Sequence, residues 1–166
     1  MGEPAKYILL VDRALSLLST YTNWYWSGLR GKREALRGDI FEALPEAEQP
    51  SDGDSIALKV VGSRRLRCSK ADVIRLSDEE ANLLLPISCL GERYATFVDT
   101  KRLDFGRRLS PGEAVFVSEK GHTKDLPGVV RYKGELPTCP GTMFGVELTV
   151  GINSPIDRPL SLGRRL

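Results

Sequence analysis

Histidine is nearly absent from this 166-residue chain and cysteine is scarce, with one histidine and three cysteines in all. The thiols of Cys68, Cys89 and Cys139 are widely spaced and form no Cys-x-x-Cys pair, which argues against a disulfide framework. A four-ligand zinc site would need all three thiols together with His122, at a spacing that resembles no zinc pattern. We therefore predict free thiols in a reducing compartment, with no metal and no other cofactor.

Long apolar runs and a charge imbalance are also lacking. The most apolar stretch, residues 6–26, is interrupted early by Asp12 and Arg13, whereas a membrane-spanning helix needs about 20 predominantly apolar residues in a row. The stretch also lacks the uninterrupted apolar centre of a signal peptide. The formal net charge is only +2, so three short basic runs are interpreted as solvated faces. We predict a cytoplasmic protein with no membrane span and no nucleic-acid partner.

Residues 1–50 are predicted to form an amphipathic helical segment. Apolar residues recur at three- and four-residue steps, as in a helix with one buried face: Ile8, Val11, Leu15 and Leu18. Residues 32–46 favour one or two further short helices around Gly38, with Asp39 as a candidate N-cap. Residues 46–55 are polar and contain proline and glycine, which predicts a linker or an exposed loop.

Residues 51–104 are predicted to form a small module of strands and helix. Two strand-like runs, residues 55–61 and 64–69, are separated by a Gly62-Ser63 turn. The module continues into a leucine-rich segment with a different pattern.

This leucine-rich segment has the signals of a short helix. Ser77 and Glu80 have the spacing of a capping box, in which each side chain satisfies a backbone N–H group at the helix start. Pro86 lacks a donor, so it ends or kinks the helix. For residues 91–99 the apolar period does not decide between helix and strand.

Residues 105–150 are predicted to form a small β module. Three strand-like runs, at residues 112–119, 128–134 and 143–148, are separated by loops rich in glycine and proline. Several short strands with such turns are typical of a small antiparallel barrel. The predicted fold class is therefore α+β, with an N-terminal helical or mixed segment followed by this β module.

Two pentapeptides in the β module resemble the centre of a CAP-Gly domain. They are Gly-Val-Val-Arg-Tyr at residues 128–132 and Phe-Gly-Val-Glu-Leu at residues 144–148. The resemblance implies a glycine-rich, SH3-like barrel of a family best known from microtubule-associated proteins. From about residue 30 to 150, the order of strands, leucine-rich helix, Cys89-to-Arg93 segment and β module is similar to the N-terminal region and first CAP-Gly domain of the cylindromatosis (CYLD) deubiquitinase family.

The chain departs from the CAP-Gly pattern after the second pentapeptide. CAP-Gly domains that bind acidic C-terminal tails have a Gly-Lys-Asn-Asp-Gly loop where this chain has Gly-Ile-Asn-Ser-Pro at residues 151–155. Ile152 cannot make the charge-assisted hydrogen bond that a lysine makes to a carboxylate. Residues 151–166 match no closing strands of the family, so we expect an atypical tail, an incomplete barrel and a truncated chain.

The resemblance implies a non-catalytic peptide-binding site on the β module, and eight residues are predicted to form it: Gly128, Val130, Arg131, Tyr132, Phe144, Gly145, Val146 and Asn153. The glycines would leave backbone groups open to a peptide, the aromatic rings would provide contact area, and Arg131 would pair with a carboxylate. Strand alternation predicts that Tyr132 shares a face with Val130. The alternative is that Tyr132 and Phe144 fill the barrel and that the glycines serve turns alone.

The expected ligand is an acidic C-terminal tail or a proline-rich segment of another protein. The CYLD-family resemblance further implies a cytoplasmic scaffold connected with polyubiquitin removal and restraint of NF-κB signalling. It also implies association with microtubules, centrosomes or signalling adaptors.

Two other functions remain open. A cysteine-type deubiquitinase would need one of the three thiols paired with His122, but no nucleophile motif of that family surrounds any of them, and no catalytic residue is predicted. Alternatively, the chain is an incomplete splice or truncation product without a binding function of its own.

Overall fold

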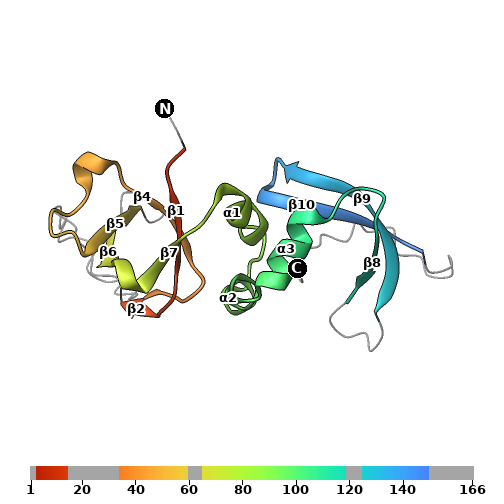
Figure 1. The fold of residues 1–166 in the computed structure, drawn as a ribbon, viewed down its shortest axis with the longest axis horizontal. Helices are drawn as coiled ribbons and strands as arrows, with labels where there is room; N and C mark the ends of the chain where they lie inside the picture. Colours follow the sequence, from red (N-terminus) through yellow and green to blue (C-terminus); the bar gives the residue numbers. More distant parts are fainter. Residues whose placement is uncertain (1–2, 15–33, 60–64, 119–124, 150–166) are drawn as a thin grey trace, which may run out of the picture. The chain divides into compact units, whose positions relative to one another are not determined.

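The computed structural model describes four stretches of the chain: residues 3–14, 34–59, 65–118 and 125–149 (Figure 1). The chain forms two compact units, Met1–Asp78 and Glu79–Leu166. Antiparallel sheets and helices together make an α+β architecture, as predicted. Compactness alone does not show which segments fold independently, so the domain boundaries drawn from the sequence stay predictions.

The first unit is built mainly from short strands. In chain order its elements are β1 (Lys6–Leu9), β2 (Arg13–Ala14), β3 (Glu34–Ala35), β4 (Ile40–Ala43), the 3₁₀ turn η2 (Glu46–Glu48), β5 (Ser55–Lys59), β6 (Arg65–Ser69), the 3₁₀ turn η3 (Lys70–Asp72) and β7 (Val73–Arg75). Five of the strands form one antiparallel sheet in the order β6-β5-β4-β1-β7, and β2 pairs with β3. β1 is thus a central strand, with β4 on one side and β7 on the other.

Apolar side chains from these strands form the core of the first unit. Leu9, Leu58 and Leu66 are almost completely buried and belong to one cluster, against which Tyr7 and Phe41 pack. Burying each large aliphatic side chain contributes about 1.5–3 kcal/mol relative to leaving it exposed. The core therefore draws on strands from both ends of the unit.

The predicted N-terminal amphipathic helix is wrong in the part that the structure describes. Residues 6–9 form β1, in which the consecutive residues Ile8 and Leu9 are both fully buried. A central strand is buried on both faces, so it needs a continuous apolar run, which periodicity alone does not distinguish from a buried helix. Val11, a supposed member of the helical stripe, is 38% exposed. Leu15 and Leu18 lie outside the described residues.

The short helices predicted within residues 32–46 are also wrong. The described part of this segment contains β3 and β4, joined by a turn at Gly38, whose φ of 94° lies in the left-handed region that favours glycine. Asp39 does not cap a helix; its carboxylate accepts a hydrogen bond from the backbone N–H of Leu36 at 2.9 Å and closes the turn. The predicted exposed loop at residues 46–55 is confirmed, apart from the single 3₁₀ turn that it contains.

The two strands predicted after this loop are confirmed as β5 and β6. They pair antiparallel from Ser55 opposite Ser69 to Lys59 opposite Arg65. The turn predicted at Gly62 and Ser63 lies outside the described residues.

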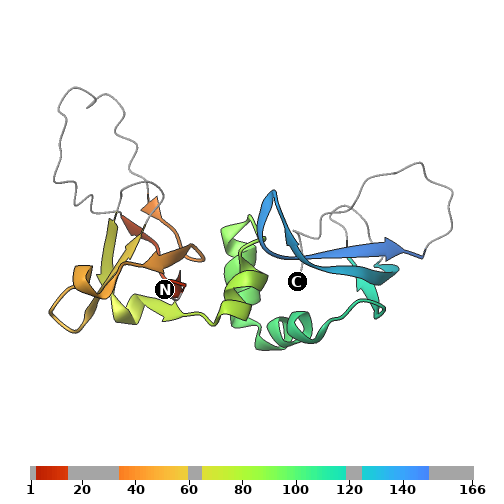
Figure 2. The ribbon, with the colours of Figure 1, turned by 90° about the horizontal axis from the view of Figure 1, so that it is seen from above.

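Three helices and a three-stranded sheet make up the described part of the second unit (Figure 2). The elements are α1 (Asp78–Leu84), α2 (Leu90–Val98), α3 (Thr100–Arg108), β8 (Ala114–Val117), β9 (Leu126–Leu136) and β10 (Cys139–Leu148). α1 ends two residues before Pro86, as predicted, and α2 shows that residues 91–98 are helical. The capping box at Ser77 and Glu80 stays a prediction.

Side chains fix the helix ends in this unit. The guanidinium of Arg93 donates to the carbonyl oxygens of Leu84 and Ile87 at 3.1 and 2.9 Å, and so satisfies acceptors at the end of α1. At the start of α3 the carboxylate of Asp99 accepts from the backbone N–H of Arg102 at 3.2 Å.

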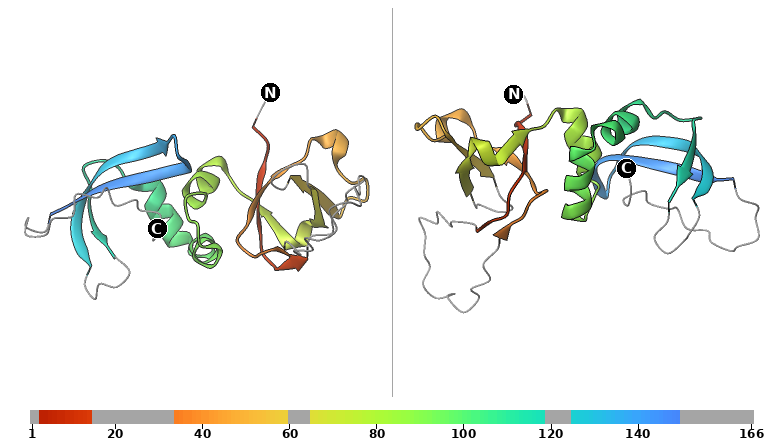
Figure 3. Two further views of the ribbon diagram at one scale, coloured as in Figure 1. Left: turned by 180° about the vertical axis from the view of Figure 1, so that it is seen from behind. Right: turned by 60° about the horizontal axis from the view of Figure 1, so that its bottom comes forward.

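The sheet of the second unit has the strand order β10-β9-β8 (Figure 3). β9 and β10 form a long antiparallel ribbon, so the segment predicted as a loop at residues 134–141 is mostly strand around a tight turn at Pro137 and Thr138. The sheet is open, and the part of the chain that the structure describes contains no closed barrel. The barrel therefore stays a prediction.

Candidate functional site

A β-bulge in β9 decides which side chains share a face of the ribbon. Val130 lies opposite Val146, and Tyr132 lies opposite Gly145, so Arg131 is one extra residue on β9. Because neighbouring residues on β10 point to opposite faces, the bulge places Val130 and Tyr132 on opposite faces as well. The predicted sharing of a face by these two residues is therefore wrong. We call the face that carries Val130 the inner face and the face that carries Tyr132 the outer face.

The inner face is packed against the interior of the unit. Val130 is fully buried and Phe144 is 3% exposed. Gly128 is buried too, and a methyl group there would lie 2.6 Å from Cγ1 of Val146, so glycine is needed for the close approach of the strands. These side chains are therefore not open at the surface, and the part they were predicted to play in peptide binding stays a prediction.

The outer face presents the ring of Tyr132, which is 41% exposed. Its hydroxyl group donates to the carbonyl oxygen of Glu135 at 2.7 Å, which holds the ring along the strand. A methyl group at Gly134 would lie 2.7 Å from this hydroxyl oxygen, and one at Gly145 would lie 3.1 Å from Cβ of Tyr132. Glycine at both positions therefore leaves room for the ring, and the result is an aromatic surface with a fixed orientation.

A charged pair and a second aromatic ring lie on the same face. Arg131 donates from Nε to Oε2 of Glu147 at 2.6 Å, and both side chains are about 60% exposed. On β8, Phe116 lies opposite Pro127 and is 77% exposed. The outer-face surface consists of Phe116, Pro127, Arg131, Tyr132, Gly145 and Glu147.

The sequence analysis missed Phe116 as a surface residue. Residues 112–119 were predicted to form a strand, but a four-residue edge strand gives no local signal of which face is covered. Of the predicted binding residues, the structure places Arg131, Tyr132 and Gly145 together on the outer face. Asn153 lies outside the described residues.

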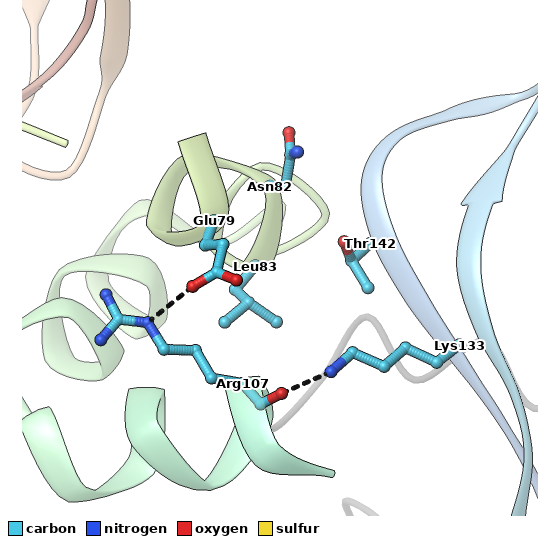
Figure 4. Close-up of a pocket in the computed structure, with 6 residues that line it drawn as sticks. All are labelled: Glu79, Asn82, Leu83, Arg107, Lys133 and Thr142. Carbon is cyan, nitrogen blue, oxygen red and sulfur yellow. Dashed lines mark hydrogen bonds and ion pairs between the residues drawn. The ribbon is translucent and has the colours of Figure 1, made fainter. Parts of the chain in front are cut away.

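The second unit also contains an open pocket of about 160 Å³ (Figure 4). Its lining residues come from α1, α3, β9 and β10: Glu79, Asn82, Leu83, Arg107, Lys133 and Thr142. Nζ of Lys133 donates to the carbonyl oxygens of Gly106 and Arg107 at 3.2 and 2.6 Å. The ammonium group thus caps the C-terminal end of α3, where the helix dipole favours a positive charge.

Three carboxylates surround the guanidinium of Arg107. Its Nη2 lies 3.0 Å from Glu80, and its Nη1 lies 3.1 Å from Asp104. Its Nε lies 3.7 Å from Glu79 (Figure 4). Nε is buried and makes no hydrogen bond, because the Glu79 oxygen is too far away. The side chain of Glu79 is 79% exposed.

The three cysteines form no disulfide and lie in different surroundings. Cys68 is buried in the core of the first unit, Cys89 is exposed, and Cys139 is half-buried at the start of β10. His122 lies outside the described residues, so the proposed pairing of a thiol with this imidazole is untested. Among the described residues, no three His, Cys, Asp or Glu side chains are grouped to hold a metal ion. No helix in the described ranges is long and apolar enough to cross a membrane.

Comparison with known proteins relates the chain to one kind of enzyme. It is 33% identical over 100 residues to ubiquitin carboxyl-terminal hydrolase CYLD from Homo sapiens, and equally to that from Bos taurus. The enzyme from Pongo abelii is 36% identical over 80 residues. The human and bovine matches cover 57% of this chain but only 10% of the relative's length. The Pongo match covers 46% of this chain and 8% of the relative's length.

The matched region of this chain is thus homologous to a small part of CYLD, as the sequence resemblance predicted. No protein-family model matches the chain, and no solved structure matches it.

Proposed function

From this homology, we propose that the chain is a non-catalytic, CAP-Gly-type protein-interaction region of a CYLD-like deubiquitinase. In this proposal β8, β9 and β10 are strands of an SH3-like barrel, and the outer-face surface binds a peptide. The observation that carries the proposal is the exposed ring of Tyr132, which two glycines and the bond to Glu135 hold against the sheet.

The ligand is an acidic C-terminal tail or a proline-rich segment. The ring of Tyr132 offers contact area at a low cost in side-chain entropy, and a proline ring packs well against such a surface. Arg131 pairs with a ligand carboxylate after leaving Glu147, which costs little because an exposed ion pair is worth at most about 1 kcal/mol.

In the whole protein, this region acts as a cytoplasmic scaffold. The proposal links it to polyubiquitin removal and to restraint of NF-κB signalling, with association to microtubules, centrosomes or a signalling adaptor. The chain itself has no hydrolase activity, so a fluorogenic ubiquitin reporter is expected to show no turnover that thiol alkylation abolishes. Sedimentation with assembled microtubules tests the cytoskeletal association.

A titration of the ¹⁵N-labelled full chain tests peptide binding. We expect an acidic peptide with a free C-terminal carboxylate, or a proline-rich peptide, to shift the amide signals of Tyr132 and Gly145. Tyr132→Ala should weaken binding about fivefold, because an aromatic contact is worth about 1 kcal/mol. Phe105→Ala is the matched control, since Phe105 is an exposed aromatic residue on α3.

The outcomes separate the alternatives. A folded chain whose outer-face signals respond to neither peptide would favour a product without a binding function of its own. Equal loss of affinity in the Tyr132 and Phe105 variants would place the binding surface elsewhere.

A further inference from the structure

We propose that the open edge of β8 pairs with the same strand of a second copy of this chain. The inference does not depend on the proposed peptide binding, because it rests on backbone groups at the edge of the sheet. β8 is the last strand in the order β10-β9-β8, so only one of its two edges is paired within the described residues (Figure 1). The other edge is where a further strand can be added.

The hydrogen bonds of β9 show which backbone groups of β8 reach this edge. Pro127, opposite Phe116, has no N–H group, and its carbonyl oxygen accepts from the N–H of Thr149 at 2.9 Å, on the β10 side. Val130 bonds toward the other side, since its N–H donates to the carbonyl oxygen of Glu113 at 2.9 Å. Antiparallel pairs alternate between bonded and non-bonded, so the N–H and C=O groups of Phe116 point away from β9.

The side chain at the centre of this edge is uncovered as well. Phe116 is 77% exposed, more than any other large hydrophobic residue in the stretches that the structure describes. Natural edge strands are usually protected by a lysine, a proline or a bulge, and the Ala-Val-Phe-Val sequence of β8 has none of them. Outward backbone groups and an exposed ring at one position therefore mark an edge that accepts another strand.

The sequence around Phe116 suits pairing with itself. Val115 and Val117 flank it symmetrically, so two copies can meet antiparallel about a two-fold axis at Phe116. In this register the two Phe116 residues exchange both N–H to C=O hydrogen bonds, and their rings lie side by side on the outer face. Val115 then lies opposite Val117 of the partner subunit on the inner face. Each copy supplies what the other lacks, which favours a second copy over an unrelated strand.

Charge and size set the expected strength of this contact. β8 carries no charge, so no like charges oppose one another inside the paired strands. Glutamates flank the strand in the sequence at positions 113 and 119, so added salt should strengthen the association by screening them. Standard interfaces contain about 20–30 residues on each side, far more than one short strand provides. We therefore expect a weak dimer, with a Kd of about 0.1 mM.

Sedimentation velocity of the full chain between about 10 µM and about 1 mM tests the proposal. We expect the sedimentation coefficient to rise from the monomer value toward that of a dimer. Phe116→Pro should weaken the association at least about tenfold, because proline lacks the N–H that only the dimer uses, while the bonds of β8 to β9 stay intact. Phe105→Ala is the matched control and should leave it unchanged, since Phe105 is an exposed aromatic residue on α3 of the same unit.

Hydrogen exchange of the unaltered chain is a second measurement, which does not depend on the folding of a variant. The Phe116 amide should exchange more slowly as the concentration rises, whereas the amides of Val115 and Val117, which face β9, should be protected throughout. A chain that stays monomeric at about 1 mM would overturn the proposal. So would a dimer that Phe116→Pro does not weaken, because the contact would then lie elsewhere. A Phe116 amide protected equally at every concentration would show that another strand already covers this edge, with the same consequence.

Discussion

Single glycines in the β9–β10 ribbon are constrained by their neighbours. A methyl group at Gly128 would lie 2.6 Å from Cγ1 of Val146 and 2.9 Å from the backbone oxygen of Glu147. Backbone cannot move aside as a side chain can, so overpacking at this point strains the strand pair. Glycine at positions 134 and 145 instead makes room for the side chain of Tyr132. The glycines of the ribbon therefore serve two purposes, close strand approach at Gly128 and space for an aromatic ring at the other two positions.

Gly128→Ala should therefore destabilise the second unit by about 1–3 kcal/mol, as overpacking in a well-packed core does. Gly91→Ala is the matched control, because no atom lies within 4 Å of the added methyl group and the position is in α2. The control should be neutral or stabilise the protein by up to about 1 kcal/mol. Urea unfolding of both variants measures the difference, and equal free energies of unfolding would contradict this account of Gly128.

The carboxylate of Asp52 makes the stability of the first unit depend on pH. Its carboxylate accepts from the hydroxyl group and backbone N–H of Ser55 and from Arg67. The hydrogen bond from the Ser55 side chain, followed by that from Arg67, lowers the pKa of Asp52 below its usual value of 3.8. A lowered folded-state pKa stabilises the protein above about pH 4, and this contribution is lost as the pH falls through the folded value.

Asp52→Asn should remove that contribution. We expect the variant to have a lower melting temperature than the parent chain at neutral pH. The difference in melting temperature should disappear as the pH falls toward 2, because the parent carboxyl group is then protonated. Thermal unfolding across this pH range measures the gap. A gap that stays constant with pH would mean that packing, not ionisation, causes the loss.

At the level of secondary structure, cations fix the ends of two helices in the second unit. Arg93 donates to carbonyl oxygens at the end of α1, and Lys133 does the same at the end of α3. Lys133 also lies 5.7 Å from the ring centre of Phe144, so it connects the helix with the buried face of the ribbon.

Lys133→Met should destabilise the second unit by about 1–3 kcal/mol. The substitution keeps an apolar stem but removes the charged donor from two carbonyl oxygens at a helix end. Lys101→Met is the matched control, since Lys101 is exposed near the start of α3, where a positive charge gains nothing from the helix dipole. The free energy of unfolding in urea checks both variants, and similar values would show that the cap is unimportant.

Elements with strong local signals could be predicted from the sequence. Strand-like runs next to turn residues predicted β5 and β6, and Pro86 predicted the end of α1. β1 could not be predicted in this way, because the burial of both Ile8 and Leu9 depends on neighbours that are distant in sequence. The bulge at Arg131 has no local signature either, so the site residues were predicted without their division between two faces.

At the scale of the whole molecule, homology and compactness describe different parts of the chain. The similarity to CYLD covers 57% of the residues, whereas the chain divides into compact units at Asp78 and Glu79. The resemblance therefore predicted the homology to a part of CYLD but gave no reason to expect a five-stranded sheet in the first unit. That sheet depends on the pairing of β1 with both β4 and β7, which joins the two ends of the unit.

A fragment of residues 1–78 tests whether this sheet is self-sufficient. The buried members of the core cluster all come from residues 9–73, and β7, the last strand of the sheet in the chain, ends at Arg75. We therefore expect the fragment to fold alone and to melt cooperatively, with amide shifts that match those of the full chain for β1, β4 and β5. Because a unit of this size buries a smaller fraction of its surface than a larger domain, its melting temperature should be modest. An unfolded fragment would show that the first unit needs the rest of the chain, and the independence of its core would then be lost.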